Sequence, residues 1–391
     1  MRGGVDSTAW CGVGDTPRCM RITAIRTDRL VVPLDPPFPA AWDPIPRTRF
    51  AVTVVRVETD EGVVGVGSGD TMDGFAPFEH LFIDQDPLAI ARHVRALETI
   101  DFHAGRYWPL EVALWDIAGQ VAGLPVAHLF GGTLDGIPAY ASCGSLVPAA
   151  ERAERSLRMR DEGFRALKIR VDPSDPARLE EGIAGVRATR EAVGDSMAIM
   201  VDINQGWRMA GDVRPSIKFA AARTIAERLA ELDVLWLEEP LDGSDLAGLA
   251  ALRAAVPGIR IAGGEMTRTF RELEAALDAD AFDVHQADVV LAAGMSNGRR
   301  LAECVLAKGR WYSPHTWTNG IGLLANLHVA AGVGGGPFLE FPYDPPGWTP
   351  ERRDAFLTEP IRPGADGILR VPAAPGIGAV LDEAAIKRYA A

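Results

Sequence analysis

Cysteine is scarce in this sequence of 391 residues, which contains only Cys11, Cys19, Cys143 and Cys304. No two of them form a Cys-x-x-Cys pair. Four scattered cysteines argue against a disulfide scaffold and give no zinc-site spacing. The first residues contain no apolar core of signal-peptide length, so we expect a cytoplasmic protein.

Long apolar runs and excess basic charge are also absent. Residues 311–339 lack Asp, Glu, Lys and Arg but are broken by Pro314, His315, Asn319 and several glycines. A spanning helix needs about 20 mostly apolar residues, so we expect no membrane segment. Basic residues number 40 against 53 acidic ones, a net charge of −13. That balance argues against nucleic acid as a partner, because nonspecific binding to nucleic acid needs a basic surface.

The remaining composition is that of a globular protein, with 47% hydrophobic and 24% charged residues. A single core stops growing near roughly 250–300 residues, so we expect a large domain and a smaller one. Residues 1–19 show no periodic pattern and are predicted to be a disordered tail.

The segment 20–135 indicates a small α+β unit. Two β-branched runs within 50–70 flank Asp60-Glu61-Gly62, which predicts a hairpin. Residues 33–49 are too rich in proline for a helix or a central strand and are expected to be turns. Residues 110–123 predict a helix with one apolar face, formed by Leu110, Ala113, Ile117 and Val121.

From residue 136 onward, short apolar runs alternate with amphipathic helical segments. This alternation predicts a parallel α/β barrel. A doubly wound open sheet is the alternative, but no Gly-x-Gly-x-x-Gly turn follows the first run. The eight predicted strands are 137–143, 166–171, 197–203, 234–240, 259–265, 282–288, 311–315 and 337–341.

Nearly every one of these runs ends in an ionisable residue. Successive positions are 23 to 36 residues apart, the length of one strand with its helix. The carboxyl ends of barrel strands surround one mouth, so we expect these side chains to converge there. They are Lys168, Arg170, Asp202, Glu238, Glu239, Glu265, Asp288, His315 and Glu340.

Three of these acids, Asp202, Glu238 and Glu265, come from successive strands. Carboxylates held together repel each other unless a cation neutralises them. Oxygen ligands favour Mg²⁺, or Mn²⁺, over zinc. Any one of these acids alone is more simply a solvated carboxylate or a helix cap. Three acids in register favour a metal site.

His315 ends the seventh run and Asp288 ends the sixth. A carboxylate beside an imidazole fixes its tautomer and raises its basicity, which makes a general base; a buried structural histidine is the alternative. Lys168 and Arg170 are two residues apart, so both side chains point to the same side of their strand. If they face the barrel axis, they need anions around them.

Together these motifs resemble the enolase superfamily, in its mandelate racemase and muconate lactonizing enzyme branch. The resemblance covers most of residues 20–391. It implies a (β/α)7β modified TIM barrel, residues 136–349, and an α+β capping domain formed by residues 20–135 and the C-terminal segment 350–391. It rests on Lys168-Ile-Arg170, Asp202-Ile-Asn204-Gln205, Trp236-Leu-Glu238-Glu239-Pro240, Gly263-Gly264-Glu265, Asp288, His315, Glu340 and the segments 113–132 and 372–383.

The resemblance also implies the chemistry, which is abstraction of the proton α to a carboxylate. It implies one Mg²⁺ on Asp202, Glu238 and Glu265, and it places Glu239 outside the ligand set. Glu340 resembles the acid that hydrogen-bonds the substrate carboxylate oxygen away from the metal. A homo-oligomer is implied as well.

The sequence departs from the family pattern at Arg170, where a second lysine usually acts as a base. Guanidinium stays protonated in proteins and is a poor base. This leaves His315 with Asp288 as the expected base and Lys168 as a contact to the substrate. We therefore predict a dehydratase of a sugar acid, an aldonate or aldarate. The alternatives are a racemase, epimerase or cycloisomerase, and a non-catalytic sugar-acid-binding protein.

Asn204 and Trp317 are predicted to contact the substrate, and Thr316 and Asn319 to line the pocket beside them. The loops 33–49 and 67–74 are expected to cover the barrel mouth. Their charged residues either meet substrate hydroxyls or are solvated loop charges; these are Asp43, Arg47, Asp70 and Asp73.

Overall fold

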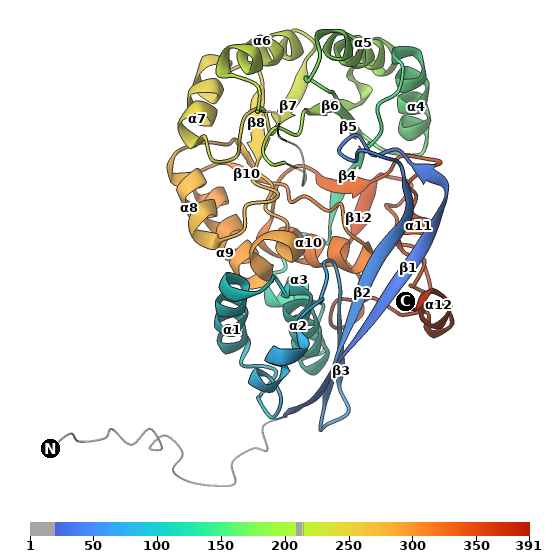
Figure 1. Cartoon of the computed structure of the whole chain (residues 1–391), viewed down its shortest axis with the longest axis vertical. Helices are drawn as coiled ribbons and strands as arrows, with labels where there is room; N and C mark the ends of the chain where they lie inside the picture. The colour runs from blue at the N-terminus through green and yellow to red at the C-terminus, as the bar shows by residue number, and fades with distance from the viewer. Residues whose placement is uncertain (1–19, 209–212, 214) are drawn as a thin grey trace, which may run out of the picture.

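The computed structural model describes residues 20–208, 213 and 215–391. The predicted tail, residues 1–19, lies outside the described residues. Figure 1 shows a barrel, coloured green through orange, above a smaller N-terminal unit coloured blue to teal. The architecture is a barrel with a capping unit, as the sequence predicted.

The N-terminal sheet is antiparallel, in the order β1–β2–β3, and comprises β1 (Ile22–Phe38), β2 (Arg47–Thr59) and β3 (Val64–Gly67). The predicted hairpin is confirmed, and Gly62 has a φ of +79° in its turn. The expectation of turns over residues 33–49 was wrong at both ends, because β1 continues through Pro33 and Pro36 to Phe38 and β2 begins at Arg47. β1 is an edge strand, where a missing N–H leaves no ladder bond unmade.

Of the helices of this unit, α2 packs against β2 and β3, α1 packs against α2, and α3 packs against α2. They are η1 (Ala76–Leu81), α1 (Ile90–His103), α2 (Trp108–Ala122) and α3 (Val126–Leu129). The predicted apolar face of α2 is buried at Leu110, Ala113 and Ile117. Val121 is 47% exposed, so the buried face ends one turn before the prediction. The strands contribute Ile22, Val55 and Val57 to this core.

The barrel strands are all parallel, and their order along the sheet follows the chain, with the last strand beside the first. Between the last two strands, the Gly336 N–H donates to the Tyr312 carbonyl over 2.7 Å. The eight predicted strands are confirmed, although the sixth and seventh are shorter than their apolar runs. They are β4 (Gly136–Ser142), β5 (Ala166–Arg170), β6 (Ala198–Asp202), β7 (Val234–Glu238), β8 (Arg260–Gly263), β9 (Val284–His285), β10 (Trp311–Tyr312) and β11 (Leu339–Pro342).

In the part of the chain that the structure describes, a helix follows each of the first seven barrel strands. This is the predicted (β/α)7β arrangement. The helices are α4 (Ala149–Asp161), α5 (Pro176–Val193), α6 (Phe219–Ala230), α7 (Leu246–Ala255), α8 (Phe270–Asp278), α9 (Gly294–Ala307) and α10 (Gly320–Val333). A short 3₁₀ helix η2 (Gly194–Ser196) follows α5, and a π-helical turn η3 (Val289–Ala293) precedes α9.

The apolar stretch 311–339 contains α10, which is buried along nearly its whole length. Among the described helices, none combines the length and the apolar character needed to cross a bilayer. The stretch is therefore apolar because α10 packs into the core of the fold.

Alternation along β5 sorts its side chains between two environments. Leu167 and Ile169 pack outward into the helix layer, whereas Lys168 and Arg170 face the barrel axis and its carboxylates. Below them, an apolar layer that includes Tyr140, Met200, Trp236 and Val284 fills the barrel interior. The charged side chains thus lie directly above an apolar layer of the barrel interior.

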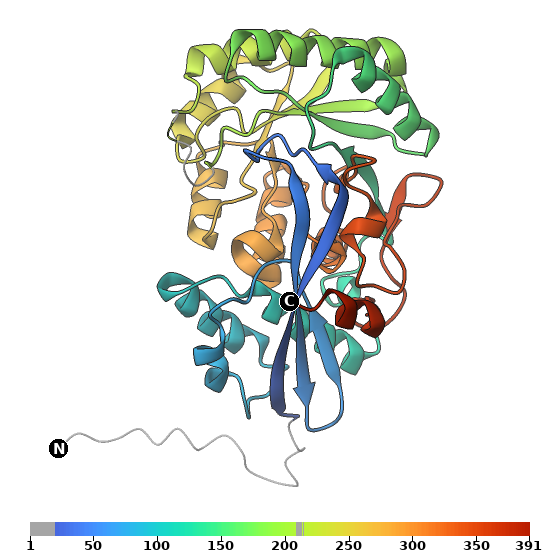
Figure 2. The same ribbon diagram turned by 45° about the vertical axis from the view of Figure 1, so that its right-hand side comes forward.

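The C-terminal segment returns to the N-terminal unit. β12 (Ile368–Arg370) pairs antiparallel with β4, and a bridge joins Leu30 of β1 to Ala390, just beyond α12 (Glu383–Tyr389). Figure 2 shows α12 beside the long β1–β2 ribbon. The short helix α11 (Pro350–Arg353) opens this segment. The domain boundaries at residues 135 and 349 stay our proposal, supported by the starts of β4 and α11.

His328 of α10 links the N-terminal unit to the C-terminal segment through hydrogen bonds. Its Nδ1 accepts from the Ala127 N–H over 3.0 Å, and its Nε2 donates to the Ile377 carbonyl over 3.0 Å. The ring is completely buried, and this burial lowers the pKa of His328 from 6.5 to about 4. The folded protein therefore resists protonating this ring at pH values where the unfolded chain accepts the proton.

We expect the free energy of unfolding to fall on acidification because of His328. As the pH falls from 6.5 to 4, only the unfolded state gains this proton, at about 1.4 kcal/mol per pH unit or roughly 3 kcal/mol in all. His328→Gln should lower stability at pH 7, and its deficit relative to wild type should shrink toward pH 4. Urea unfolding at several pH values measures this; a deficit that is constant with pH would contradict it.

Candidate functional site

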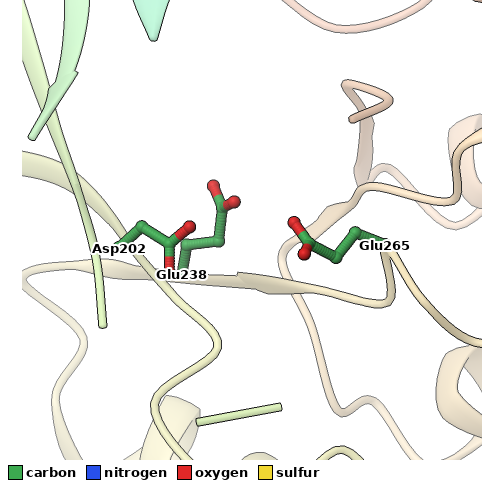
Figure 3. Close-up of side chains that lie close together, drawn as sticks. All are labelled: Asp202, Glu238 and Glu265. Atoms are coloured by element: carbon green, nitrogen blue, oxygen red, sulfur yellow. The ribbon is translucent and has the colours of Figure 1, made fainter. Parts of the chain in front are cut away.

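The predicted metal ligands meet at the mouth of the barrel. Asp202 ends β6, Glu238 ends β7, and Glu265 lies two residues beyond β8. Each is buried, and one carboxylate oxygen from each lies within 4.8 Å of the others. Figure 3 shows the carboxylates of Asp202 and Glu238 side by side, with that of Glu265 facing them.

Hydrogen bonds hold one oxygen of each glutamate. Glu238 Oε2 accepts from Gln286 Nε2 over 2.6 Å and from Trp236 Nε1 over 3.2 Å. Glu265 Oε1 accepts from Trp207 Nε1 over 2.7 Å. Glu265 Oε2 is buried without a hydrogen-bond partner among the described residues. An unpaired buried carboxylate oxygen is costly, so this atom is available as a ligand.

Arg170 is held by several partners at once. It forms an ion pair with Asp202, and it donates to Asn204 Oδ1 over 3.0 Å and to the Cys143 carbonyl over 3.3 Å. Its guanidinium lies 4.8 Å from the centre of the Trp42 ring. The Asn204 N–H in turn donates to Asp202 Oδ1 over 2.7 Å. These contacts hold the guanidinium in place, and guanidinium stays protonated in proteins, so Arg170 is a poor candidate for a base.

Lys168 lies between acids from two sides of the barrel. Its Nζ donates to Glu238 Oε1 and lies 2.8 Å from Glu340 Oε1 and 3.7 Å from Asp202 Oδ2. Burial acts to lower the pKa of Lys168, but Glu238 and Glu340 outweigh it and raise that pKa above its usual value. Lys168 is therefore a fixed positive charge at the centre of the site.

His315 and Asp288 form the pair that the sequence predicted. His315 Nδ1 lies 2.9 Å from Asp288 Oδ2, and Asp288 Oδ1 accepts from Asn326 Nδ2 and the Val290 N–H, each over 2.9 Å. With Nδ1 facing Asp288, His315 Nε2 lies 3.7 Å from Glu265 Oε2. The second ring nitrogen, Nε2, is therefore directed at the three predicted metal ligands.

The charge on His315 depends on the acids around it. Burial acts to lower the pKa of His315, but Glu265, Glu340 and Asp288 outweigh burial and raise that pKa to about 9. Without a cation in the site, the imidazole is therefore protonated at neutral pH. A divalent cation that neutralised Glu265 would remove the largest attraction for this proton.

Glu340 lies across the site from the metal ligands. Its Oε1 accepts from Ser142 Oγ and its Oε2 from the Thr316 N–H, each over 2.7 Å. Burial acts to raise the pKa of Glu340, but Lys168 and His315 outweigh it and hold that pKa below the usual value. Glu340 is ionised in this arrangement.

The loop 33–49 covers this site with aromatic rings. Trp317 stacks on Phe38 at 5.7 Å between ring centres, and it meets the edge of Trp42 at 4.9 Å. Trp317 Nε1 also donates to Ser142 Oγ over 2.8 Å. Figure 2 shows the tip of the β1–β2 ribbon crossing to the barrel. Trp317 therefore lies where the loop meets the site.

Other residues that the sequence assigned to the pocket have partners within the fold. Asn319 is buried, caps the start of α10 by accepting from its N–H groups, and donates to Ser68 Oγ over 2.7 Å; its place in the pocket lining stays a prediction. The charged loop residues form ion pairs: Asp43 with Arg47, Asp70 with Arg106 at 3.8 Å and Asp73 with Arg29 at 3.9 Å.

The charges at the barrel mouth fit a divalent cation. Among the described residues, five buried carboxylates besides Asp288, which is paired with His315, lie there against the two permanent cations Lys168 and Arg170. Burial raises the pKa of Glu239 well above its usual value, and Glu265 and Glu238 add to that shift. A cation would relieve this excess of negative charge without protonation. The metal-competent group contains Glu238 and not Glu239; the five acids are Asp202, Glu238, Glu239, Glu265 and Glu340.

Sequence reasoning missed three residues that orient the site. Gln286 holds Glu238, Trp207 holds Glu265, and Asn326 holds Asp288. Asn326 gave a usable signal, since it is a polar residue inside the apolar helix α10. Gln286 lies two residues before Asp288 at the end of a strand run. Trp207 lies in a loop and gave no signal by spacing.

Comparison with known proteins agrees with this geometry. The profile of the Enolase C-terminal domain-like family matches residues 149–385. D-galactarolactone cycloisomerase of Agrobacterium fabrum is 30% identical over 95% of this chain and 99% of its own length. L-talarate/galactarate dehydratase of Salmonella typhimurium is 28% identical over 75% of this chain and 74% of its own.

A solved structure shows the same fold. L-talarate dehydratase from a Polaromonas species, crystallised with Mg and L-glucarate, superimposes with a TM-score of 0.80 at 26% identity. The match covers 95% of this chain and 98% of that one. The family profile, the full-length relative and the barrel with its cap agree, and the chain belongs to the enolase superfamily.

Proposed function

We propose that this protein is a Mg²⁺-dependent dehydratase of a sugar acid, either an aldonate or an aldarate. The observation that carries the proposal is the placement of His315 Nε2, 3.7 Å from a group of three buried carboxylates and oriented by Asp288. A base beside a cation site suits removal of the proton α to a carboxylate. Dehydratases of galactarate and arabinonate are among the relatives.

Asp202, Glu238 and Glu265 would hold the cation, with Mn²⁺ as an alternative to Mg²⁺. When bound, the cation would stabilise negative charge that develops on the substrate carboxylate. Lys168 and Arg170 supply two further positive charges on the same side of β5. Glu340 lies across from the trio and is proposed to contact the carboxylate oxygen that is directed away from the cation.

His315 is the proposed base and acid of one reaction. The imidazole accepts the α-proton at Nε2, while the C–H bonding pair remains on the substrate as an enolate. The enolate pair forms the Cα–Cβ double bond as the β-hydroxyl leaves, protonated by His315, as water. The enol product becomes a 2-keto acid. Asn204 and Trp317 are proposed to contact the substrate at the edge of the site.

Cycloisomerisation is the second candidate, favoured by two relatives that match over nearly their full length, cycloisomerases of a galactarolactone and of an anhydro-galactonate. Both reactions begin with the same proton abstraction. Racemisation or epimerisation is less well supported, because it needs a base on each face of the α-carbon and Arg170 cannot supply one. A non-catalytic binding protein is disfavoured by the intact base and carboxylate trio.

Screening a library of acid sugars and their lactones with Mg²⁺ tests the proposal. We expect at least one acid to give a product that reacts with semicarbazide, as 2-keto acids do, and to exchange its α-proton in deuterated buffer. An isomeric product with no semicarbazide reaction would replace the dehydratase by a cycloisomerase. Binding without turnover or proton exchange would support a binding protein. The cytoplasmic location and the homo-oligomer remain proposals.

A further inference from the structure

The π-helical turn η3 contacts Asp288, the residue that orients the proposed base. Asp288 directly precedes the turn, and its Oδ1 accepts from the Val290 N–H over 2.9 Å. Its other carboxylate oxygen, Oδ2, lies 2.9 Å from His315 Nδ1. π-helical turns are rare, and they occur frequently at functional sites. The orientation of His315 therefore depends on how the backbone of η3 is held.

Side chains of the N-terminal unit hold η3 from outside the barrel. Trp108 Nε1, at the start of α2, donates to the Ala292 carbonyl over 3.0 Å. Arg106 Nη1 donates to the preceding carbonyl, that of Leu291. Glu111 of α2 is completely buried and caps the next helix, α9, by accepting from two of its N–H groups. In Figure 1, α1 and α2 lie below α9. Two successive carbonyls of the turn are thus bound by the N-terminal unit.

Loop 67–74 packs on the same turn. A β-carbon added at Gly69 would lie only 2.5 Å from Val290 Cγ2, so the loop backbone lies against η3 with no room for a side chain. In the same loop, Asp70 Oδ2 lies 3.8 Å from Arg106 Nη2, and the two side chains are only 19% and 15% exposed. The loop that is expected to cover the barrel mouth is therefore in contact with the turn beside the base.

Arg106 is the side chain that joins these parts. Trp108 and Glu111 bind η3 and α9, but in the part of the chain that the structure describes neither forms a hydrogen bond or an ion pair with loop 67–74. Arg106 makes both contacts through different nitrogens of one guanidinium, Nη1 for the Leu291 carbonyl and Nη2 for the loop. A guanidinium presents its donors in a fixed fork, so it can bind two partners in different directions at once.

We propose that Arg106 is a positioning residue for the base. It fixes η3 and links this turn to loop 67–74, and thereby holds Asp288 and His315 in the geometry that proton abstraction requires. This inference rests on the proposed function, because it needs His315 to act as the base. A displacement of about 1 Å in a reacting group can cost about 10²-fold in rate, so even a small relaxation of η3 should be measurable.

Arg106→Met should lower kcat for α-proton exchange by about tenfold to a hundredfold. KM should change by less than about threefold, because the carboxylate trio, Lys168 and Arg170 stay in place. The assay uses the full chain with Mg²⁺ and the acid sugar that the library screen identifies, followed by NMR in deuterated buffer. Arg95→Met is the matched control, since it removes the same charge from an exposed position of α1 and should keep the wild-type kcat.

Asp70→Asn tests the link to the loop. This variant removes the loop's charged partner of Arg106 but leaves the bond to the Leu291 carbonyl, so it should lower kcat by a smaller factor. The double variant Arg106→Met/Asp70→Asn should be no slower than Arg106→Met alone, because the second change removes a contact that is already lost. Effects of the two changes that multiply would contradict a link through this pair.

The proton resonance of the His315 ring gives a second readout, which needs no substrate. An imidazole N–H that donates to a carboxylate resonates far downfield, and His315→Asn assigns this signal in the metal-free protein. Arg106→Met should shift or broaden the signal, and Arg95→Met should leave it unchanged. A merely structural role of Arg106 would lower the unfolding midpoint but leave the resonance of the folded protein where it is.

Two results would overturn the proposal: an unchanged kcat for exchange in Arg106→Met, or a His315 resonance that does not respond to this variant. If Arg106→Met does not fold, Asp70→Asn decides by the same two measurements, because it leaves the contact to η3 intact. A wild-type protein that exchanges no α-proton, but whose resonance responds to Arg106→Met, would refute the proposed function and retain the link between Arg106 and the His315–Asp288 pair.

Discussion

Replacing His315 by asparagine should abolish both turnover and the exchange of the substrate α-proton with deuterated solvent. A positioned general base contributes about 10²–10⁴-fold, and both assays depend on it. Asparagine can still accept or donate near Asp288 but cannot take up a proton. NMR of the substrate in deuterated buffer measures exchange directly, and it does so even where product formation is slow.

The pH dependence of the wild type should report the same residue. His315 must be neutral to accept the proton, so kcat/KM should rise with pH through the pKa of His315. That pKa is raised to about 9 by the site's own carboxylates. With saturating Mg²⁺ the rise should therefore occur below pH 9, since a cation on Glu265 removes the strongest attraction for the proton.

Arg170→Gln is the matched control for the base assignment, because a lysine at this position would restore the base of the family pattern. It removes the positive charge beside Asp202 and part of the contacts to Cys143 and Asn204, but no group that can accept a proton. We expect reduced turnover with exchange retained and the same acid limb in the pH profile. If His315→Asn still exchanged the α-proton, a base on the opposite face would have to exist. Lys168 would then be the candidate, and a racemase or epimerase would become the better interpretation.

Glu265→Gln should have opposite effects on the metal-free and the metal-bound protein. Glu265 carries a buried oxygen without a partner in the described structure, and burial raises its pKa. Removing this charge should leave the unfolding midpoint in chelator unchanged or higher. The stabilisation by Mg²⁺, about 2.7 kcal/mol for wild type at 100 times Kd, should be lost. Activity should fall by roughly 10³-fold or more, because cation stabilisation of the enolate contributes several kcal/mol.

Calorimetric unfolding with and without Mg²⁺ measures both effects at once. Glu274→Gln on α8 is the matched control, since it makes the same change at an exposed position paired with Arg300. That variant should keep the Mg²⁺ response. Full wild-type activity in excess chelator, or an unchanged Mg²⁺ response in Glu265→Gln, would contradict a cation site at this trio.

Much of the site could be predicted because its residues follow strands. Asp202 and Glu238 each end a barrel strand, and a parallel barrel brings such positions to one mouth regardless of loop details. Alternation within β5 was enough to put Lys168 and Arg170 on the same face. The cation site and the base were predicted from residue type, because three carboxylates need a cation and an imidazole beside a carboxylate acts as a base. Abstraction of the proton α to a carboxylate was predicted only from the resemblance to the family.

Contacts between distant loops could not be predicted. Arg170 lies against Trp42, 128 positions earlier, and Asn319 caps α10 while binding Ser68. Nothing local in either loop indicates its partner, because those contacts depend on how the cap sits over the barrel. The extension of β1 through Pro33 was missed for a related reason. Whether proline is tolerated in a strand depends on whether that strand is an edge.

The pairing of β1 with the C-terminal segment bears on how the chain folds during synthesis. The Leu30–Ala390 bridge joins residues 360 positions apart, so this contact to β1 can form only after the whole barrel has been synthesised. At roughly 5–20 residues per second, the ribbon waits roughly 20–70 s for that partner. Throughout this interval the side chain of Leu30, which is completely buried in the folded protein, lacks part of its cover. The nascent chain should therefore depend on chaperones until Ala390 has been synthesised.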